Sequence, residues 1–166
     1  RVIAEKDFAG YFVIVHDILE TKDIRPITIA FSKKFLVTVE KKNGEPHIMN
    51  MVKTRLKKAR VDPPALVSYY LLDEIVSDHF EHLEKIEELT ATLEEEILEK
   101  PQYETLRRVF KLKSRLVSFN KILWYERGMI FNLKRSEINL IPTKARNLFD
   151  TAHEYLTRQI DIVETY

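Results

Sequence analysis

Cysteine is absent from this sequence, and glycine and proline are scarce, with three and six residues among 166. The lack of cysteine excludes disulfides and thiolate metal or catalytic sites, and it suits a reducing compartment. So little glycine and proline argues against a disordered chain or a β-sandwich. The longest apolar run, YFVIV at 11–15, is far shorter than the roughly 20 residues that span a bilayer. No signal peptide is visible.

Hydrophobic residues make up 45% and charged residues 32% of the chain, which predicts one soluble, folded domain, with or without an appendage. The sequence opens on RVIAEKDF without methionine and stops on VETY inside a predicted helix. We therefore expect a piece of a longer protein.

The formal net charge of +1 hides a strong segregation of charge along the chain. Twelve acids and two lysines lie between 73 and 104, whereas nine bases and the single acid Glu126 lie between 107 and 135. Such a pattern favours the pairing of an acidic helix with a basic one. Each exposed ion pair contributes only about 0–1 kcal/mol to it.

The first 40 residues have the pattern of short strands. YFVIVHDIL is β-branched and aromatic, and SKK separates ITIAF from FLVTV, as in a tight antiparallel hairpin. Apolar residues alternate in both arms, which predicts one buried face. That face is formed by Ile27, Ile29, Phe31, Phe35, Val37 and Val39. An Asn-Gly turn in KKNGEP ends the sheet.

A basic helix is predicted at 46–60, where PHIMNMVKTRLKKAR spaces its apolar residues helically. The bases form a solvated face without an interleaved aromatic platform, so we expect no nucleic-acid partner. DPP at 62–64 breaks this helix. It divides the chain into an α/β subdomain at 1–62 and a helical part at 63–166.

Three long helices are predicted after the prolines. The first runs from about Ala65 to Glu99, and the second begins at Pro101, so the short break between them implies an antiparallel hairpin. The third starts near Pro142 or Thr143 and continues to Tyr166. The first helix has a heptad seam at Leu72, Val76, His79, Leu83, Ile86, Thr90, Leu93 and Ile97. The third has one at Ala145, Phe149, Ala152, Leu156, Gln159 or Ile160, Val163 and Tyr166.

The second helix carries two apolar ladders with a seven-residue repeat. One is Val109, Leu116, Leu123 and Ile130. The other is Phe110, Val117, Trp124 and Phe131. Together they predict a wide apolar face that packs against two neighbours. The predicted fold class is α+β, a small α/β layer domain followed by a long antiparallel helical hairpin and a third, stalk-like helix.

Motifs of common enzymes are missing. The sequence has neither a thiol nor a nucleophile elbow, no glycine-rich phosphate loop and no His-Glu-x-x-His pair. With 26 acidic residues, neighbouring carboxylates alone carry no information. We therefore expect no enzymatic activity.

Asp73 and Asp150 are candidate ligands for a hard cation such as Mg²⁺. Asp73 lies beside the apolar seam in LLDEIV, where the alternative is a pairing with a base. His153 and Glu154 share a helix face with Asp150, and the alternative is a simple solvated face.

Asp78, His79 and His82 occupy two consecutive turns and form a second candidate group. The alternative is that His79 is a polar residue of the seam while the other two are solvated.

Residues 68–133 combine three features: the opening YYLLDEIVSDHF, an acidic helix that ends in EEEILEKP, and the helix KLKSRLVSFNKILWYER. Together these features resemble the cytoplasmic domain of the CorA family of magnesium and cobalt transporters. The resemblance continues through YFVIVH and FLVTVEKKNGEP, and through LFDTAHEYLTRQIDIVETY, and so covers nearly the whole chain.

The resemblance implies a homopentameric channel of the cell inner membrane, with this part on the cytoplasmic side. A stalk helix leads into the membrane, and the transmembrane helices are not in this sequence. Mg²⁺ or Co²⁺ bound between subunits holds such a channel closed. The ligands that the resemblance assigns here are Asp73, Asp150 in the stalk helix and His153 one turn further. A further acidic pair of the family, upstream of the first strand, has no counterpart here.

Two alternatives stay open. A ZntB-type zinc transporter belongs to the same superfamily and differs around a pore loop that this sequence does not contain. A coiled-coil scaffold domain with no ion role would account for the heptads alone.

Overall fold

The computed structural model describes residues 3–5, 8–16, 24–40, 53–54, 63–135 and 140–166. Four strands form one antiparallel sheet in the order β1-β2-β3-β4: β1 (Ile3–Glu5), β2 (Phe8–His16), β3 (Ile24–Phe31) and β4 (Leu36–Glu40). The predicted helix at 46–60 and the Asn-Gly turn lie outside the described residues, apart from Lys53 and Thr54, which are helical.

Ser32 organises the tight turn that joins β3 to β4. Its hydroxyl oxygen accepts hydrogen bonds from the backbone N–H groups of Lys34 and Phe35 at 3.1 and 3.3 Å, and its own N–H donates to the carbonyl oxygen of Phe35. The hairpin that the SKK sequence predicts is therefore confirmed.

One face of the sheet packs against the helices. Its buried side chains include Tyr11 and Val13 of β2 and the predicted set of β3. The Tyr11 hydroxyl donates to the carbonyl oxygen of Ser68 at 2.8 Å, which fastens the sheet to the first long helix. Burial raises the pKa of this Tyr11 hydroxyl, so it stays protonated and remains a donor.

The prediction that Phe35, Val37 and Val39 share this buried face is wrong, because all three are exposed. The register pairs Ile29 with Thr38, which places Val37 on the opposite side of the sheet. Since side chains alternate strictly along a strand, an offset of one residue in the turn moves the whole apolar set to the other face.

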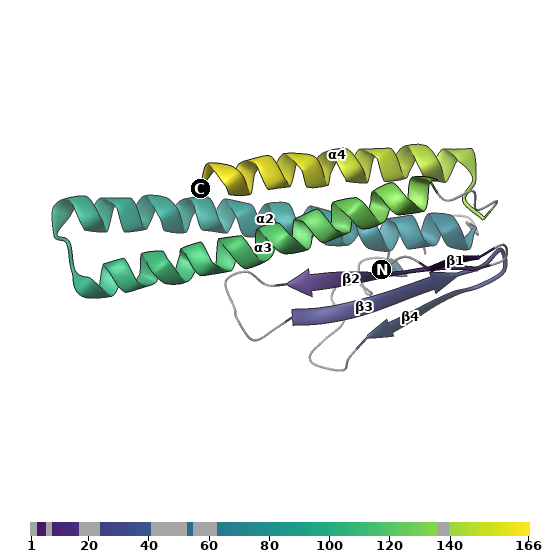
Figure 1. Cartoon of the computed structure of the whole chain (residues 1–166), viewed down its shortest axis with the longest axis horizontal. Coiled ribbons are helices and arrows are strands. Elements are labelled where there is room, and N and C mark those ends of the chain that lie inside the picture. Colours follow the sequence, from purple (N-terminus) through teal and green to yellow (C-terminus); the bar gives the residue numbers. More distant parts are fainter. Residues whose placement is uncertain (1–2, 6–7, 17–23, 41–52, 55–62, 136–139) are drawn as a thin grey trace.

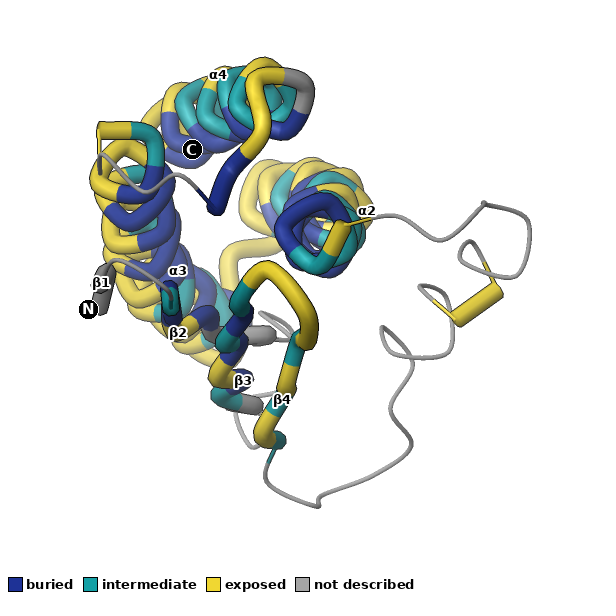
Figure 2. Tube along the Cα trace, turned by 90° about the vertical axis from the view of Figure 1, so that its right-hand side faces the viewer, coloured by how far each residue is buried: buried dark blue, intermediate teal, exposed yellow. Residues whose placement is uncertain are grey.

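Three long helices complete the fold: α2 (Pro64–Glu99), α3 (Tyr103–Arg135) and α4 (Thr143–Thr165). They run side by side, and α2 and α3 extend well beyond the end of α4 (Figure 1). Seen along the bundle, α2 and α3 lie nearer the sheet and α4 lies on the far side (Figure 2). Buried residues of the sheet and of all three helices form one continuous core. The fold class predicted from the sequence is confirmed, whereas the division at residue 62 stays a prediction.

The ends of the helices follow from local chemistry. Pro64 is the first residue of α2, a position where the missing N–H of proline costs nothing. The prediction that Pro101 begins the second helix is wrong by two residues. The helix begins at Tyr103, and the carbonyl oxygen of Gln102 accepts its first helical bond from the N–H of Leu106.

The two ladders of α3 differ in how far their side chains are buried. Leu116, Leu123 and Ile130 are buried and Val109 is half-buried, as predicted. The prediction that the second ladder also packs against a neighbouring helix is wrong within this chain, because each of its members remains 45% to 63% exposed. These members are Phe110, Val117, Trp124 and Phe131. The second ladder therefore lies on the outer side of α3, and Phe131 at its end is beside His153 of α4.

Candidate metal-binding residues

Asp73 lies in the third turn of α2 and is half-buried. Its carboxylate accepts a hydrogen bond from the hydroxyl of Tyr69, one turn earlier, at 2.9 Å. The ring of Tyr69 meets the ring of Phe149 on α4 edge to face, with centroids 5.6 Å apart. Packing between the two helices therefore fixes the donor that orients this carboxylate.

Asp150 follows Phe149 on α4 and forms an ion pair with Lys134 near the end of α3. Nearby, Arg146 donates to the carbonyl oxygens of Lys134 and Ile141 at 3.1 and 3.3 Å, which fastens the end of α3 to the start of α4. The side chain of Asp150 is still 48% exposed, so its carboxylate remains open to a cation from solution.

His153 lies one turn beyond Asp150 and is half-buried beside the ring of Phe131. Burial lowers its pKa below the usual value, and the positive charges of Lys134 and Arg127 lower it further. At neutral pH the imidazole is therefore mainly neutral, which is the form that binds a metal.

Asp73 and Asp150 lie at the same level of the bundle. Both helices begin at the same end (Figure 1), and the two residues follow the starts of α2 and α4 by nine and seven residues. Within one copy, however, the described part of the chain brings no three His, Cys, Asp or Glu side chains together closely enough to hold a metal. A site that uses these residues needs further ligands from elsewhere, such as a second copy or water.

The donors fit a hard divalent cation. Carboxylate oxygens are the ligands that Mg²⁺ prefers, and it keeps several of its waters when bound. An imidazole nitrogen beside them is also acceptable to Co²⁺. A partly exposed Asp150 with neutral His153 one turn away provides this mixture.

The histidines of α2 have a structural place. His79 is buried in the seam, as one reading of the sequence predicted, with its Nδ1 3.8 Å from Oε2 of Glu126 and its ring against Phe119. His82 is also buried, with its Nε2 3.3 Å from Oδ2 of Asp78, so the expectation that it is solvated is wrong. These contacts explain both histidines without a metal.

The sequence did not indicate that Lys134 lies beside Asp150 or that Glu126 is buried in the bundle. Gln159, one of two residues offered for its position in the third seam, is also buried. Glu126 is the only acid among the nine bases between 107 and 135, and this isolation could have marked it as a residue with a specific place in the bundle. Nothing in the sequence showed which base would meet Asp150.

A cavity of about 440 Å³ lies between α2 and α3 beside the end of α4. Its lining is mostly apolar, with Leu93, Leu112, Leu116 and Val163 among the contributing side chains. It does not include the candidate ligands. An apolar lining suits helix packing better than ion binding. Separately, none of the helices in the described parts of the chain combines the length and the apolar character that crossing a bilayer requires.

Comparison with solved structures defines the class of fold. The soluble domain of CorA from Methanocaldococcus jannaschii superposes with a TM-score of 0.83 at 21% identity, covering all of this chain and 68% of that one. The ZntB cytoplasmic domain from Vibrio parahaemolyticus gives 0.76 at 19% identity, covering 99% and 65%. The sheet and the three long helices thus have the fold of these two solved domains.

Sequence comparison then shows the family. The family model described as CorA-like Mg²⁺ transporter protein matches residues 4–166. The chain belongs to this family, which is one of transporters rather than enzymes. The cobalt/magnesium transport protein CorA of Thermotoga maritima is 30% identical over 147 residues, covering 84% of this chain. The chain spans about two fifths (40%) of the length of that curated relative.

Proposed function

We propose that this chain is the cytoplasmic regulatory part of a CorA-type Mg²⁺ or Co²⁺ channel. In this proposal, divalent cations bind between copies and hold the channel closed. The observation that carries it is the placement of Asp73 and Asp150 at one level of the bundle, on two adjacent helices, in a chain of this family.

The whole protein is a homopentamer of the cell inner membrane, with the part described here on the cytoplasmic side and transmembrane helices elsewhere in the protein. Asp73 of one copy faces Asp150 and His153 of the next. The segment 1–62 forms one subdomain, and the helices from 63 onward form the hairpin and the stalk. Membership of the CorA-like family and the fold shared with a solved CorA transporter support this arrangement.

Electrostatics supplies the regulation. Carboxylates from two copies repel one another when the interface closes, and a divalent cation between them reverses the sign of that interaction. The cation shifts the equilibrium toward the closed state only by the difference between its affinities for the two states. Release of the cation at low Mg²⁺ frees the copies to move, and the channel opens.

Thermal unfolding of the assembled protein tests this function. At a Mg²⁺ concentration of one hundred times Kd, binding adds about 2.7 kcal/mol to the free energy of unfolding. For a chain of this size, the midpoint should rise by roughly 5–10 °C. Asp73→Asn and Asp150→Asn should lose most of that rise, whereas Glu154→Gln, which removes an exposed carboxylate beside the site, should keep it.

A midpoint that does not respond to Mg²⁺ or Co²⁺ in the assembled protein would refute the regulatory role. A response to Zn²⁺ alone would favour a zinc transporter of the ZntB type.

A further inference from the structure

The outward ladder of α3 is an unusual surface for a single chain. Phe110, Val117, Trp124 and Phe131, together called the aromatic stripe, repeat every seven residues and are exposed by 63%, 49%, 49% and 45%. The three aromatic side chains, each about half exposed, present on the order of 300 Å² of apolar surface. Patches of that size on a monomer are often functional, and a seven-residue repeat is the pattern of a helix that packs along another helix.

Gly128 lies on the same side of α3, one turn from Trp124 and from Phe131. Glycine destabilises the interior of a helix relative to alanine. Apart from its two chain neighbours and the backbone of its own helical turns, a Cβ atom at this position would meet no atom within 4 Å, so no packing contact in the same chain requires a glycine. A position without a side chain beside an exposed apolar stripe allows the backbone of another helix to approach closely.

Positive charge surrounds the aromatic stripe. The guanidinium of Arg127 lies 3.9 Å from the centre of the Trp124 ring, and that of Arg135 lies 5.3 Å from the Phe131 ring. The exposed bases of α3 are Arg107, Lys111, Lys113, Lys121 and Arg135. No acid is exposed between 106 and 135, since Glu126 is buried. A partner for this face should therefore be acidic.

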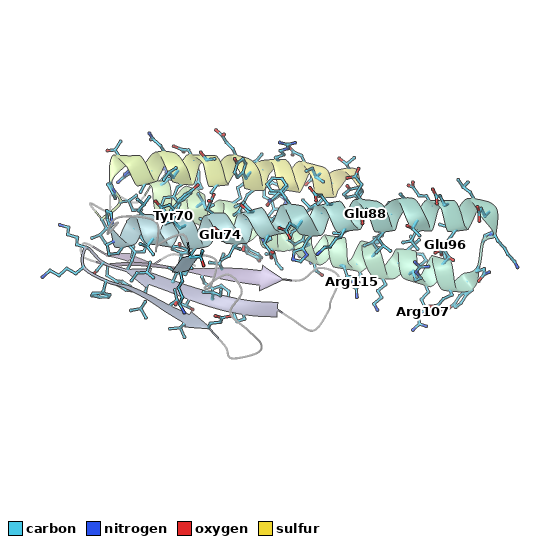
Figure 3. All side chains as sticks on the ribbon, turned by 180° about the vertical axis from the view of Figure 1, so that it is seen from behind. Tyr70, Glu74, Glu88, Glu96, Arg107 and Arg115 are labelled. Carbon is cyan, nitrogen blue, oxygen red and sulfur yellow. The ribbon has the colours of Figure 1, made fainter. Side chains whose placement is uncertain are left out.

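α2 carries such an acidic face. Glu74, Glu81, Glu88 and Glu95, together called the glutamate ladder, also repeat every seven residues, and the last three are exposed. Glu74 and Glu88 are both seen on α2 when the molecule is viewed from behind (Figure 3). The ladder covers 74 to 95 and the stripe covers 110 to 131, so each is about 32 Å long at 1.5 Å per residue.

The ladder and the stripe lie at the same height but on opposite flanks. Glu96 and Arg108 pair near the tip of the hairpin at 2.6 Å, so Glu95 and Phe110 are both near the tip. In the view along the bundle, α3 and α2 lie on opposite sides of the molecule, and both carry exposed residues (Figure 2). Two complementary surfaces on opposite flanks generate a head-to-tail contact, which closes into a ring when the rotation between copies permits.

We propose that the aromatic stripe of α3 packs against the glutamate ladder of α2 in a second copy of this chain. The inference rests on the proposed assembly into a ring and names the faces that join its members. An anionic lipid surface would also attract the bases, but it would require neither the matching seven-residue ladder on α2 nor the glycine on α3.

Cross-linking of single-cysteine variants tests the contact, because the natural chain has no cysteine. Ser114→Cys and Thr92→Cys place small, exposed thiols beside the stripe and beside the ladder. A short bismaleimide added to a mixture of the two variants should give the mixed 114–92 dimer well in excess of either same-site dimer. Lys33→Cys, in the exposed turn between β3 and β4, replaces either partner as the control and should give no product.

Gly128→Gln and Trp124→Ala, each combined with the same cysteines, separate docking from folding. Gly128→Gln should raise the thermal midpoint of the dilute chain, because glutamine is the better helix former, and should still lower the yield of the mixed dimer about tenfold. Trp124→Ala should lower the yield by a similar factor.

Equal yields of same-site and mixed dimers would overturn the inference, as would no product over a concentration series that reaches millimolar. Co-sedimentation with phosphatidylglycerol vesicles in the absence of a mixed dimer would assign the stripe to lipid instead. The Mg²⁺ titration tests the proposed function separately. A mixed dimer without a response to Mg²⁺ would keep the interface and reject the ion role, and the converse would keep the ion role alone.

Discussion

Replacing Lys134 by methionine should strengthen the binding of divalent cations. Lys134 holds the carboxylate of Asp150 in an ion pair, and a cation that binds Asp150 must either displace the ammonium group or tolerate it nearby. Methionine keeps the apolar stem of the side chain and removes its charge. The variant therefore changes the electrostatics beside Asp150 while the packing at the end of α3 stays similar.

The structure sets the size of this effect. Asp150 is about half exposed, so the dielectric constant of water applies, and a single charge about 5 Å from a doubly charged cation repels it by about 1.7 kcal/mol. Salt at physiological strength reduces this repulsion to about 1 kcal/mol. The expected gain in affinity is roughly fivefold. The free energy of unfolding without cation should fall by less than about 1 kcal/mol, as for other exposed pairs.

Isothermal titration of the assembled protein with Mg²⁺ or Co²⁺ measures this gain. Lys121→Met is the matched control, because it removes the same charge from an exposed position of the same helix. An unchanged Kd in Lys134→Met, or an equal gain in the control, would show that Asp150 is not a ligand.

Three further predictions concern the bundle itself. Phe149→Ala removes a fully buried ring and should lower the free energy of unfolding by about 3–5 kcal/mol in urea denaturation; a loss below about 1 kcal/mol would contradict the packing described. Gln159→Met keeps the volume but loses the hydrogen bond from Nε2 to the carbonyl oxygen of Val76 at 2.7 Å, and should cost about 1–2 kcal/mol in the same assay. Arg108 holds the pKa of the Glu96 carboxyl below its usual value, so that pair stabilises the fold above the unfolded-state pKa, and the effect is lost as the pH falls through the folded-state pKa. Arg108→Ala should therefore flatten the acid limb of a plot of thermal midpoint against pH, and an unchanged limb would reject the contribution of this pair.

The sequence predicted the helical part of the fold well because long periodic segments are unambiguous. The predicted seams from Leu72 to Ile97 and from Ala145 to Tyr166 are mostly buried as expected, although their last members, Ile97 and Tyr166, are exposed. The errors arose where the period is short or where one helix has two apolar faces. A single-residue offset in the turn placed Val37 and Val39 on the exposed face of the sheet. For Trp124, no local signal shows whether the side chain packs within its own chain or against another.

Less of the candidate site could be predicted. The positions of Asp73 and Asp150 made them candidates, but their assignment as ligands, together with His153, came from a family resemblance, because isolated carboxylates in an acidic sequence carry little signal of their own. The ion pair of Asp150 with Lys134 depends on how α3 and α4 meet, which is a tertiary property. One reading of the sequence placed His82 in solvent, yet it is buried. Periodicity reports which face of a helix is apolar, but not how far the neighbouring helices cover that face.

In the proposed assembly, Asp73 of one copy and Asp150 of the next bind the same cation. Coexpression of Asp73→Asn copies with Asp150→Asn copies tests this sharing in the assembled protein. Each variant alone should show no Mg²⁺-dependent rise in thermal midpoint. In random mixed rings, roughly a quarter of the interfaces join an intact Asp73 to an intact Asp150. Mg²⁺ stabilisation should therefore return in part in the mixture. Mixed rings that respond no more than either variant alone would contradict it.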